Sequence, residues 1–319
     1  MERTYINEAQ KAIGGTVKVQ GFIENLRNSK YMAFIVLKDI TGKLQITVEK
    51  EDHPELVDTI DKLTPDSVIT VTGKVMENDY VKMGGVEMIP ESIEIESIAN
   101  ALPIVRKEIA ATKKKKAVER SSIDQRIDYR WIDLRTDENQ LMFKAQSCFV
   151  NAMRKFLLDR NFIEIHTPKL IAAASESGSE VFKVDYFDRN AYLAQSPQFY
   201  KQMAMAAGFE RIFETGPVFR AEKSYTNKHS TEFSGFDLEF SYITSYKDVM
   251  KMEEELLTAG LQAVKDNYGD QIKEMFGQEV IVPTTPFPVV KLADLYKGLE
   301  EEFGYTVDES EKGDLTTEA

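Results

Sequence analysis

Charged side chains of both signs crowd one short segment, GPVFRAEKSYTNKHSTEFSGFDLEF, residues 216–240. Its ionisable residues include Arg220, Glu222, His229, Glu232, Asp237 and Glu239. In SGFDLEF apolar and acidic residues alternate, so the two carboxylates share one face of a strand and the two phenylalanines the other. Burying adjacent carboxylates is costly unless a cation or donors meet them. The pattern predicts a hairpin whose charged front holds a metal, an ammonium or an Arg/Lys network; the alternative is an exposed edge hairpin.

The connection between the two strands, residues 223–231, is longer than a hairpin requires, which is typical of functional or disordered loops. The sequence contains neither GxGxxG nor GxxxxGK[ST], the two usual phosphate-binding loops. Any nucleotide must therefore be held by other groups.

Composition narrows the class of protein. The 319 residues suffice for two domains, and 42% hydrophobic with 29% charged residues predicts a globular chain. No apolar run is long enough to span a membrane, and MERTYINEAQ lacks the apolar core of a signal peptide. Cys148 is the single cysteine, which excludes an intramolecular disulfide and suits a reducing compartment. A Cys/His zinc cluster is also absent from the sequence.

The charge distribution is uneven. The net charge of −13 argues against a nucleic-acid partner, but residues 103–135 hold ten Lys/Arg against five Asp/Glu. A local basic strip of this kind can bind RNA even in an acidic protein. A solvated linker is the alternative interpretation.

Hydrophobic periodicity gives the elements that would position these groups. Alternation predicts five strands and one short helix over residues 16–98, a small closed barrel of the oligonucleotide-binding (OB) type or a generic β-domain. A linker follows. Apolar residues then recur at helical spacing from Gln140, before a strand that ends near Pro168. The remaining mixture of strands and helices predicts an α+β domain.

Several motifs carry a family resemblance. GPVFRAEKSYTNKHSTEF with SGFDLEF resembles the second signature motif of class II aminoacyl-tRNA synthetases, and FLLDRNFIEIHTPKL resembles the first. YRWIDLR and AYLAQSPQFYKQMAMAAGFERIFETGPVFR resemble the aspartyl-tRNA synthetase family of archaeal/eukaryotic-like type. The resemblance implies an OB-fold anticodon-binding domain at 1–102, a hinge at 103–130 and a class II antiparallel-sheet catalytic domain at 131–319. The third class II motif is absent, so we expect a C-terminally truncated chain with an incomplete catalytic domain.

The resemblance also assigns roles on the hairpin. The catalytic residue would be Arg220, whose planar guanidinium suits two oxygens of the ATP α-phosphate. The other expected ATP contacts are Glu222, His229, Glu232 and Phe233, the last stacked on adenine. Asp237 and Glu239 would receive the substrate ammonium, with Glu239 as the candidate Mg²⁺ ligand. Glu222 and Ser224 would face the tRNA acceptor end.

The expected aspartate side-chain pocket comes from other segments. Lys201 resembles the family lysine that pairs with the substrate side-chain carboxylate, and Gln198 shares its helical face. A buried ammonium would favour aspartate over asparagine, whereas a lone surface lysine is the alternative. Ser175 and Glu176 resemble the mobile loop that closes over the amino acid, although an ordinary loop has the same composition.

Four barrel residues match family positions that contact the anticodon. Phe34 would stack on a splayed base, Gln45 and Glu87 would read base edges, and Arg27 would contact a phosphate. Without the resemblance, the run MAFIVL makes Phe34 a core residue.

The function implied is ATP-dependent attachment of L-aspartate to tRNA through aspartyl-adenylate, on tRNA(Asp) alone or also on tRNA(Asn). ATP and Mg²⁺ are the expected cofactors, and a cytoplasmic homodimer formed through residues 141–168 is the expected assembly. Two alternatives stay open. One is an asparaginyl-tRNA synthetase, against which Lys201 argues; the other is a non-catalytic tRNA-binding or regulatory paralogue, which the absent third motif favours.

Overall fold

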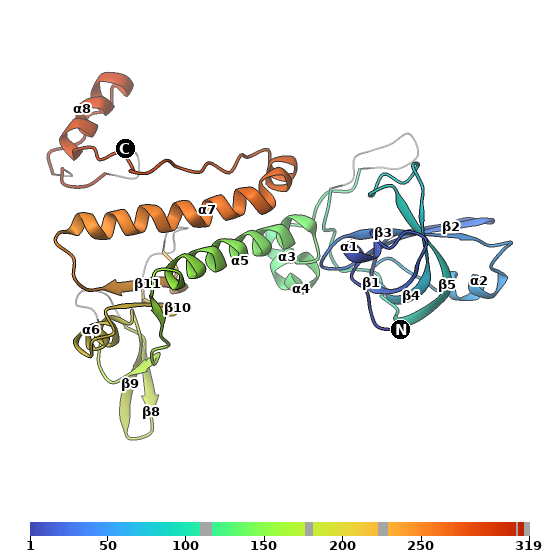
Figure 1. Cartoon of the computed structure of the whole chain (residues 1–319), viewed down its shortest axis with the longest axis horizontal. Coiled ribbons are helices and arrows are strands. Elements are labelled where there is room, and N and C mark those ends of the chain that lie inside the picture. Colours follow the sequence, from blue (N-terminus) through green and yellow to red (C-terminus); the bar gives the residue numbers. More distant parts are fainter. Residues whose placement is uncertain (109–116, 176–180, 223–228, 311, 316–319) are drawn as a thin grey trace. The chain divides into compact units, whose positions relative to one another are not determined.

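The computed structural model describes residues 1–108, 117–175, 181–222, 229–310 and 312–315. The chain divides into two compact units, Met1–Asp133 and Leu134–Ala319 (Figure 1). Within the described ranges, none of the helices combines the length and apolar character needed to cross a membrane.

The first unit is a closed five-stranded barrel with the strand order β1-β2-β3-β5-β4. Its strands are β1 Thr16–Asn28, β2 Met32–Lys38, β3 Lys43–Glu49, β4 Val68–Glu77 and β5 Val86–Ser97. The pairing of β3 with β5 is parallel, and the others are antiparallel. Short helices α1 Ile6–Ala9, η1 Pro54–Leu56 and α2 Val57–Ile60 accompany the barrel. The OB-type barrel expected from strand spacing is therefore confirmed.

Alternation along the strands fills the barrel. In β2 the inward residues Ala33, Ile35 and Leu37 are fully buried, as period two requires. Gly73 marks a close approach of two strands, because a Cβ there would lie 2.3 Å from the Ile89 carbonyl oxygen. The β4–β5 register shifts at this point, so glycine permits the local bend of the barrel wall.

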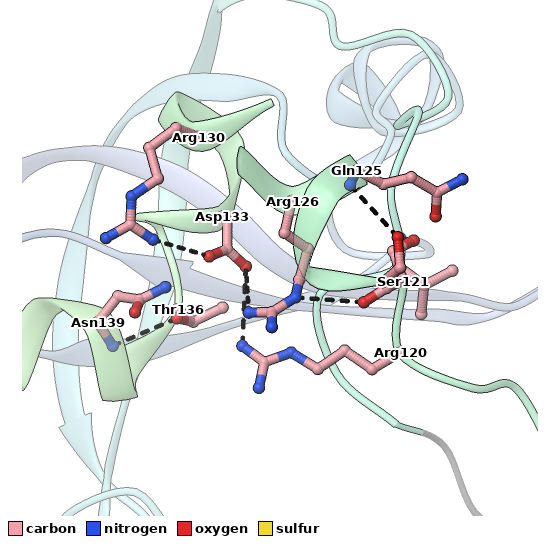
Figure 2. A network of polar contacts seen from close by, with 10 residues as sticks. Arg120, Ser121, Gln125, Arg126, Arg130, Asp133, Thr136 and Asn139 are labelled. Atoms are coloured by element: carbon pink, nitrogen blue, oxygen red, sulfur yellow. Dashed lines mark hydrogen bonds and ion pairs between the residues drawn. The ribbon is translucent and has the colours of Figure 1, made fainter. Parts of the chain in front are cut away.

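The end of the first unit is fixed by an ion network around Asp133, which Figure 2 shows at close range. This segment holds α3 Ile123–Asp128 and α4 Arg130–Asp133. The Asp133 side chain is 1% exposed and lies 3.1 Å from Arg130, 3.5 Å from Arg126 and 3.7 Å from Arg120. Part of the basic strip therefore neutralises one buried carboxylate. The run of four lysines at 113–116 lies outside the described residues.

The second unit combines two long helices with two small sheets. Helices α5 Asp137–Leu158 and α7 Tyr246–Phe276 pack together, and a Cβ at Gly260 of α7 would lie 2.6 Å from the Phe149 ring of α5. Caps define the helix ends: the Thr136 hydroxyl accepts a bond from Asn139 N at the start of α5, and α7 opens with a Ser245 capping box. The remaining helices are α6 Gln198–Ala206 and α8 Leu292–Phe303.

One sheet has the order β11-β10-β6 and the other β7-β9-β8. Their strands are β6 Ile163–Glu164, β7 Leu170–Ile171, β8 Lys183–Tyr186, β9 Arg189–Leu193, β10 Arg211–Phe219 and β11 Glu232–Phe240. The long antiparallel hairpin of β10 and β11 confirms the α+β expectation for this part of the chain.

The back of that hairpin forms part of the second core. Phe236 stacks on Phe213 with ring centroids 5.9 Å apart, and Phe240 meets Phe162 edge to face at the same distance. Leu238 packs in the same cluster, whose buried members include Leu157 of α5. The face of β11 that alternation predicted to be apolar is thus the face that covers the core.

Candidate active site and nucleic-acid interface

The register of β10 with β11 determines what the front of the hairpin presents. Directly opposed residues of an antiparallel pair project from the same face. The pairs on this face are Ile212 with Glu239, Glu214 with Asp237, Gly216 with Gly235, Val218 with Phe233 and, one position beyond the strands, Arg220 with Thr231, joined by a 3.0 Å backbone bond. An acidic end and an arginine end therefore share one surface, separated by a pair of glycines.

The glycine pair leaves the middle of this surface without side chains. A Cβ added at Gly216 or Gly235 would come no closer than 3.6 Å to another residue. Glycine is therefore not required here by crowding, and its effect is to remove side chains from the surface between the acidic end and Arg220.

Lys201 of α6 is the cation that meets the acidic end. Its side chain is 8% exposed; its ammonium donates a hydrogen bond to Asp237 Oδ1 and lies 3.2 Å from Glu239 Oε2. Burial lowers the pKa of the Lys201 ammonium, but hydrogen bonds and charges from the two carboxylates outweigh it and raise the pKa above its ordinary value. The structure thus brings together three residues expected to contact the amino acid, and it makes Lys201 a buried residue.

Glu214 is a buried carboxylate that the sequence analysis did not select. It is 4% exposed, accepts bonds from the Thr167 backbone and hydroxyl at 2.9 and 2.7 Å, and pairs with Lys169 Nζ at 2.9 Å. Burial raises its pKa, yet these donors outweigh burial and hold the pKa below its usual value. Glu214 lies on the same face of β10 as Arg220, which is the sequence signal that could have identified it.

Arg220 and Phe233 lie together at the other end of the front face. The guanidinium carbon of Arg220 is 5.6 Å from the centroid of the Phe233 ring, within cation–π range. Glu222 is half-buried and its backbone donates to the Arg220 carbonyl at 2.8 Å. His229 and Glu232 are exposed, and the expected acceptor-end residue Ser224 lies outside the described residues.

The remaining pocket candidates surround the start of α6. Ser175 is buried, and its backbone N–H donates to Gln195 Oε1 at 3.2 Å. Gln195 is 1% exposed and was not among the expected site residues, although it belongs to the AQSPQ segment that precedes α6. Gln198 begins α6 and donates its backbone N–H to Ser196 Oγ at 3.3 Å. Glu176 lies outside the described residues.

The carboxylates of the front face suit Mg²⁺ only as partial ligands. No three Asp, Glu, His or Cys side chains gather as a metal cluster in the part of the chain that the structure describes. Mg²⁺ bound to a nucleotide commonly takes one or two protein carboxylates and completes its shell with phosphates and water. Glu239, alone or with Asp237, fits that pattern.

The four expected anticodon residues lie on the outer face of the barrel, in two adjacent rows of strand-paired residues. Arg27 pairs with Phe34 across β1 and β2, and its guanidinium carbon lies 5.9 Å from the Phe34 ring centroid. Phe34 pairs in turn with Thr47, and Gln45 pairs with Glu87 across β3 and β5. Phe34 is half-buried, whereas its neighbours Ala33 and Ile35 are fully buried. The alternative interpretation of Phe34 as a core residue is therefore wrong.

Glu87 is the centre of a hydrogen-bond network on this outer face. Its Oε2 accepts from the Thr47 hydroxyl at 2.5 Å and from Gln45 Nε2 at 3.4 Å, and its Oε1 accepts from Asn78 Nδ2 at 2.8 Å. Gln45 Nε2 also donates to Thr47 Oγ1 at 3.1 Å. Thr47 and Asn78 were not selected from the sequence.

Comparison with known proteins gives consistent matches for both units. The family "tRNA synthetases class II (D, K and N)" matches residues 122–316, and "OB-fold nucleic acid binding domain" matches residues 17–96. The chain is 42% identical to an aspartate–tRNA(Asp/Asn) ligase of Methanopyrus kandleri, over 96% of this chain and 68% of the relative. It is 41% identical to an aspartate–tRNA(Asp) ligase of Picrophilus torridus, over 85% of this chain and 61% of that protein.

Solved structures agree. The asparaginyl-tRNA synthetase from Pyrococcus horikoshii complexed with asparaginyl-adenylate superposes with a TM-score of 0.85 at 29% identity, over 98% of this chain and 70% of that one. The aspartyl tRNA synthetase from Entamoeba histolytica gives a TM-score of 0.79 at 29% identity, over 100% of this chain and 66% of that one. The chain therefore spans about two thirds of the length of these proteins.

Proposed function

The chain belongs to the class II tRNA synthetases of the D, K and N type, and we propose that it activates L-aspartate with ATP and transfers the aspartyl group to tRNA. The observation that carries this proposal is the buried Lys201 ammonium, held by Asp237 and Glu239 on the front face of the hairpin. The similarity to an aspartate–tRNA(Asp/Asn) ligase and to an aspartate–tRNA(Asp) ligase supports the same amino-acid substrate.

Charge complementarity explains why aspartate would fit this site. Aspartate brings an ammonium group and a side-chain carboxylate, so its ammonium can face Asp237 and Glu239 while its carboxylate faces Lys201. Each charge then meets opposite charges, which a buried site requires. The asparagine side chain carries no negative charge. Binding of asparagine would therefore remove water from around Lys201 without giving its ammonium a new ion pair.

The chemistry follows in two displacements. The aspartate α-carboxylate oxygen forms a bond to the α-phosphorus as the bond to pyrophosphate breaks. A terminal ribose hydroxyl of tRNA then attacks the aspartyl carbonyl carbon, its proton leaves, and AMP departs. Arg220 neutralises charge on the α-phosphate and the hairpin aligns the reactants, so no protein nucleophile is needed. Bound Mg²⁺ would supply further neutralisation of phosphate charge.

The other roles assigned by the resemblance extend this proposal to further residues. Phe233 exchanges its contact with Arg220 for stacking on adenine, and Ser175 and Gln198 line the amino-acid side. Three further residues would contact ATP: Glu222, His229 and Glu232. Glu176 would contact aspartate. The tRNA acceptor end would be contacted by both Glu222 and Ser224. On the barrel, Arg27, Phe34, Gln45 and Glu87 face the anticodon of tRNA(Asp), and of tRNA(Asn) if both are accepted.

A second function is supported by one observation, the structural similarity to an asparaginyl-tRNA synthetase. Lys201 favours aspartate, because an ammonium buried at the side-chain end suits a carboxylate substrate. A non-catalytic tRNA-binding paralogue would keep the barrel face but lack amino-acid-dependent use of ATP.

We also propose a cytoplasmic homodimer formed through residues 141–168. This segment exposes apolar side chains, with Met142, Phe143, Leu158 and Ile163 each 47–50% exposed. Their burial against a second copy would remove apolar surface from water. Analytical ultracentrifugation should give twice the mass of one chain, and Phe143→Glu should shift the mass toward a monomer.

Arg220→Ala tests the proposed function. In the protein extended through the third class II motif, we expect this variant to lose aspartate-dependent ATP–pyrophosphate exchange. Binding of tRNA should stay nearly intact, because Arg220 lies on the hairpin and the anticodon face on the barrel. Arg211→Ala, at the opposite end of β10, serves as the control for loss of a positive charge. Normal exchange in the Arg220 variant would remove Arg220 from the active site.

A further inference from the structure

Lys169 is a cation on the front face of the hairpin that the proposed function leaves without a role. It belongs to the segment between β6 and β7, and its side chain is 22% exposed. A Cβ added at Gly216 would lie 3.6 Å from Lys169 Cε and 3.8 Å from Lys169 Nζ. Because a Cβ there would project from the front face, the Lys169 ammonium lies beside the middle of that face, where the glycine pair contributes no side chain.

Two opposed carboxylates explain why a cation is held at this place. Glu214 and Asp237 face each other across β10 and β11, a position in which like charges repel. Lys169 Nζ lies 2.9 Å from Glu214 Oε1. The Lys201 ammonium bonds to Asp237. With Glu239, three carboxylates and two ammonium groups of the described residues leave one negative charge here, which the ammonium of a bound amino acid would balance.

The Lys169 ammonium has a donor to spare. A lysine ammonium carries three N–H donors. One bonds to Glu214 Oε1 at 2.9 Å and another to Thr167 Oγ1 at 3.2 Å. Within the described residues this ammonium makes no third hydrogen bond. One N–H of a largely buried cation therefore remains for a bound anionic group.

The proposed positions of the two substrates bracket this donor. The aspartate ammonium faces Asp237 and Glu239, and the ATP α-phosphate faces Arg220. The α-carboxylate joins these two ends in the aspartyl-adenylate, so it must lie between them. Gly216 is two residues beyond the strand pair that includes Asp237, about 7 Å along the strand, and four residues before Arg220, about 13 Å. Lys169 thus lies where the reacting carboxylate has to be.

We propose that Lys169 binds the α-carboxylate of aspartate and that Glu214 positions the ammonium for this contact. The inference rests on the proposed function, from which it takes the sites of the aspartate ammonium and of ATP. A hydrogen bond from Lys169 Nζ to one carboxylate oxygen leaves the other oxygen free to form the bond to the α-phosphorus. Lys169 stays protonated throughout, and Glu214 acts only through Lys169.

A purely structural ion pair between Lys169 and Glu214 is the competing explanation. Loss of a structural pair would change the binding of every ligand of the pocket by a similar factor. Loss of a direct contact with the α-carboxylate would weaken only ligands that carry this group as an anion. L-Isoasparagine, the α-amide of aspartate, keeps the ammonium and the side-chain carboxylate but has a neutral amide in place of the α-carboxylate. Comparison of the two ligands therefore isolates the proposed contact.

The test is isothermal titration calorimetry at pH 7 with L-aspartate and with L-isoasparagine, on the protein extended through the third class II motif. Lys169→Met should weaken binding of aspartate roughly tenfold, because one charge-assisted hydrogen bond is lost. Binding of L-isoasparagine should stay nearly unchanged. Lys169→Arg keeps the positive charge and should retain most of the affinity for aspartate. An equal change for the two ligands in Lys169→Met, or no change for either, overturns the inference.

Two further variants guard this comparison. Lys247→Met removes an exposed lysine of α7 and should leave both affinities unchanged. Should Lys169→Met unfold, Lys169→Gln keeps a donor for Glu214 but carries no charge. It should again weaken aspartate more than L-isoasparagine, and an equal effect on both ligands would overturn the inference.

Lys201→Met separates this inference from the function beneath it. Both ligands keep the side-chain carboxylate, so this variant should weaken both by a similar factor. If Lys201→Met changes neither affinity, or if the wild-type protein binds neither ligand, the proposed aspartate site fails, and this inference with it. If Lys201→Met weakens both ligands while Lys169→Met has an equal effect on the two, the aspartate site stands and only the role of Lys169 is wrong.

Discussion

Replacement of Lys201 by methionine isolates the charge at the acidic end of the hairpin. Methionine keeps an unbranched apolar stem of similar length, so the packing of α6 against the front face is largely retained. The substitution removes the hydrogen bond to Asp237 and the 3.2 Å ion pair with Glu239. Two neighbouring carboxylates are left without their cation.

The size of the effect follows from exposure. Removal of one partner of a fully buried ion pair costs about 3–5 kcal/mol. The Lys201 side chain is 8% exposed, but Asp237 and Glu239 are 31% and 33% exposed, so water can solvate the orphaned carboxylates. We therefore expect a destabilisation of about 2 kcal/mol, below the fully buried range. For a unit of this size that lowers the melting temperature by about 4–8 °C.

Thermal unfolding at pH 7, followed by circular dichroism, measures this difference in melting temperature. The same measurement at alkaline pH tests whether the difference depends on the charge of Lys201. Because the folded pKa of Lys201 is raised, its stabilisation is complete below the unfolded-state pKa of about 10.4 and is lost as pH rises through the folded value. The wild type should therefore lose its advantage over Lys201→Met in that alkaline window. A control variant, Lys247→Met, alters an exposed lysine of α7. Equal melting temperatures for Lys201→Met and the wild type at pH 7 would refute the buried ion pair.

Two further predictions concern other residues. Glu214→Gln should flatten the acid side of the stability curve, because the lowered pKa of Glu214 gives stabilisation that is present above about pH 4.3 and is lost as pH falls through the folded value; an unchanged acid slope in urea titrations would contradict this. Phe34→Ala should weaken binding of an anticodon stem-loop RNA by about 1–3 kcal/mol, since one stacked base loses its platform; equal affinity in anisotropy titrations would remove Phe34 from the interface.

Local pattern was sufficient for the faces of the strands. Alternation in SGFDLEF separated Asp237 from Phe236, and the structure places the latter in the core. In MAFIVL the same period was concealed, because the outward residue Phe34 is as apolar as its inward neighbours. The apolar run does not show which side of the strand faces the interior. Only the closure of the barrel determines that.

Local sequence patterns could not predict contacts between segments that are distant in the sequence. Glu214 is buried because Thr167 and Lys169, more than 40 residues earlier, donate to it. Likewise Glu87 and Thr47 meet through the β3–β5 pairing, whose register no local motif specifies. Lys201 and Asp237 were each expected at the amino-acid site, but their contact depends on how α6 packs on the hairpin.

The most direct test of the central claim compares amino acids in ATP–pyrophosphate exchange. With saturating ATP and Mg²⁺, the protein extended through the third class II motif should exchange pyrophosphate with L-aspartate and much more slowly with L-asparagine, and Lys201→Met in that protein should lose the preference. Exchange driven equally well by asparagine, or an aspartate preference that persists without the Lys201 ammonium, would contradict the account.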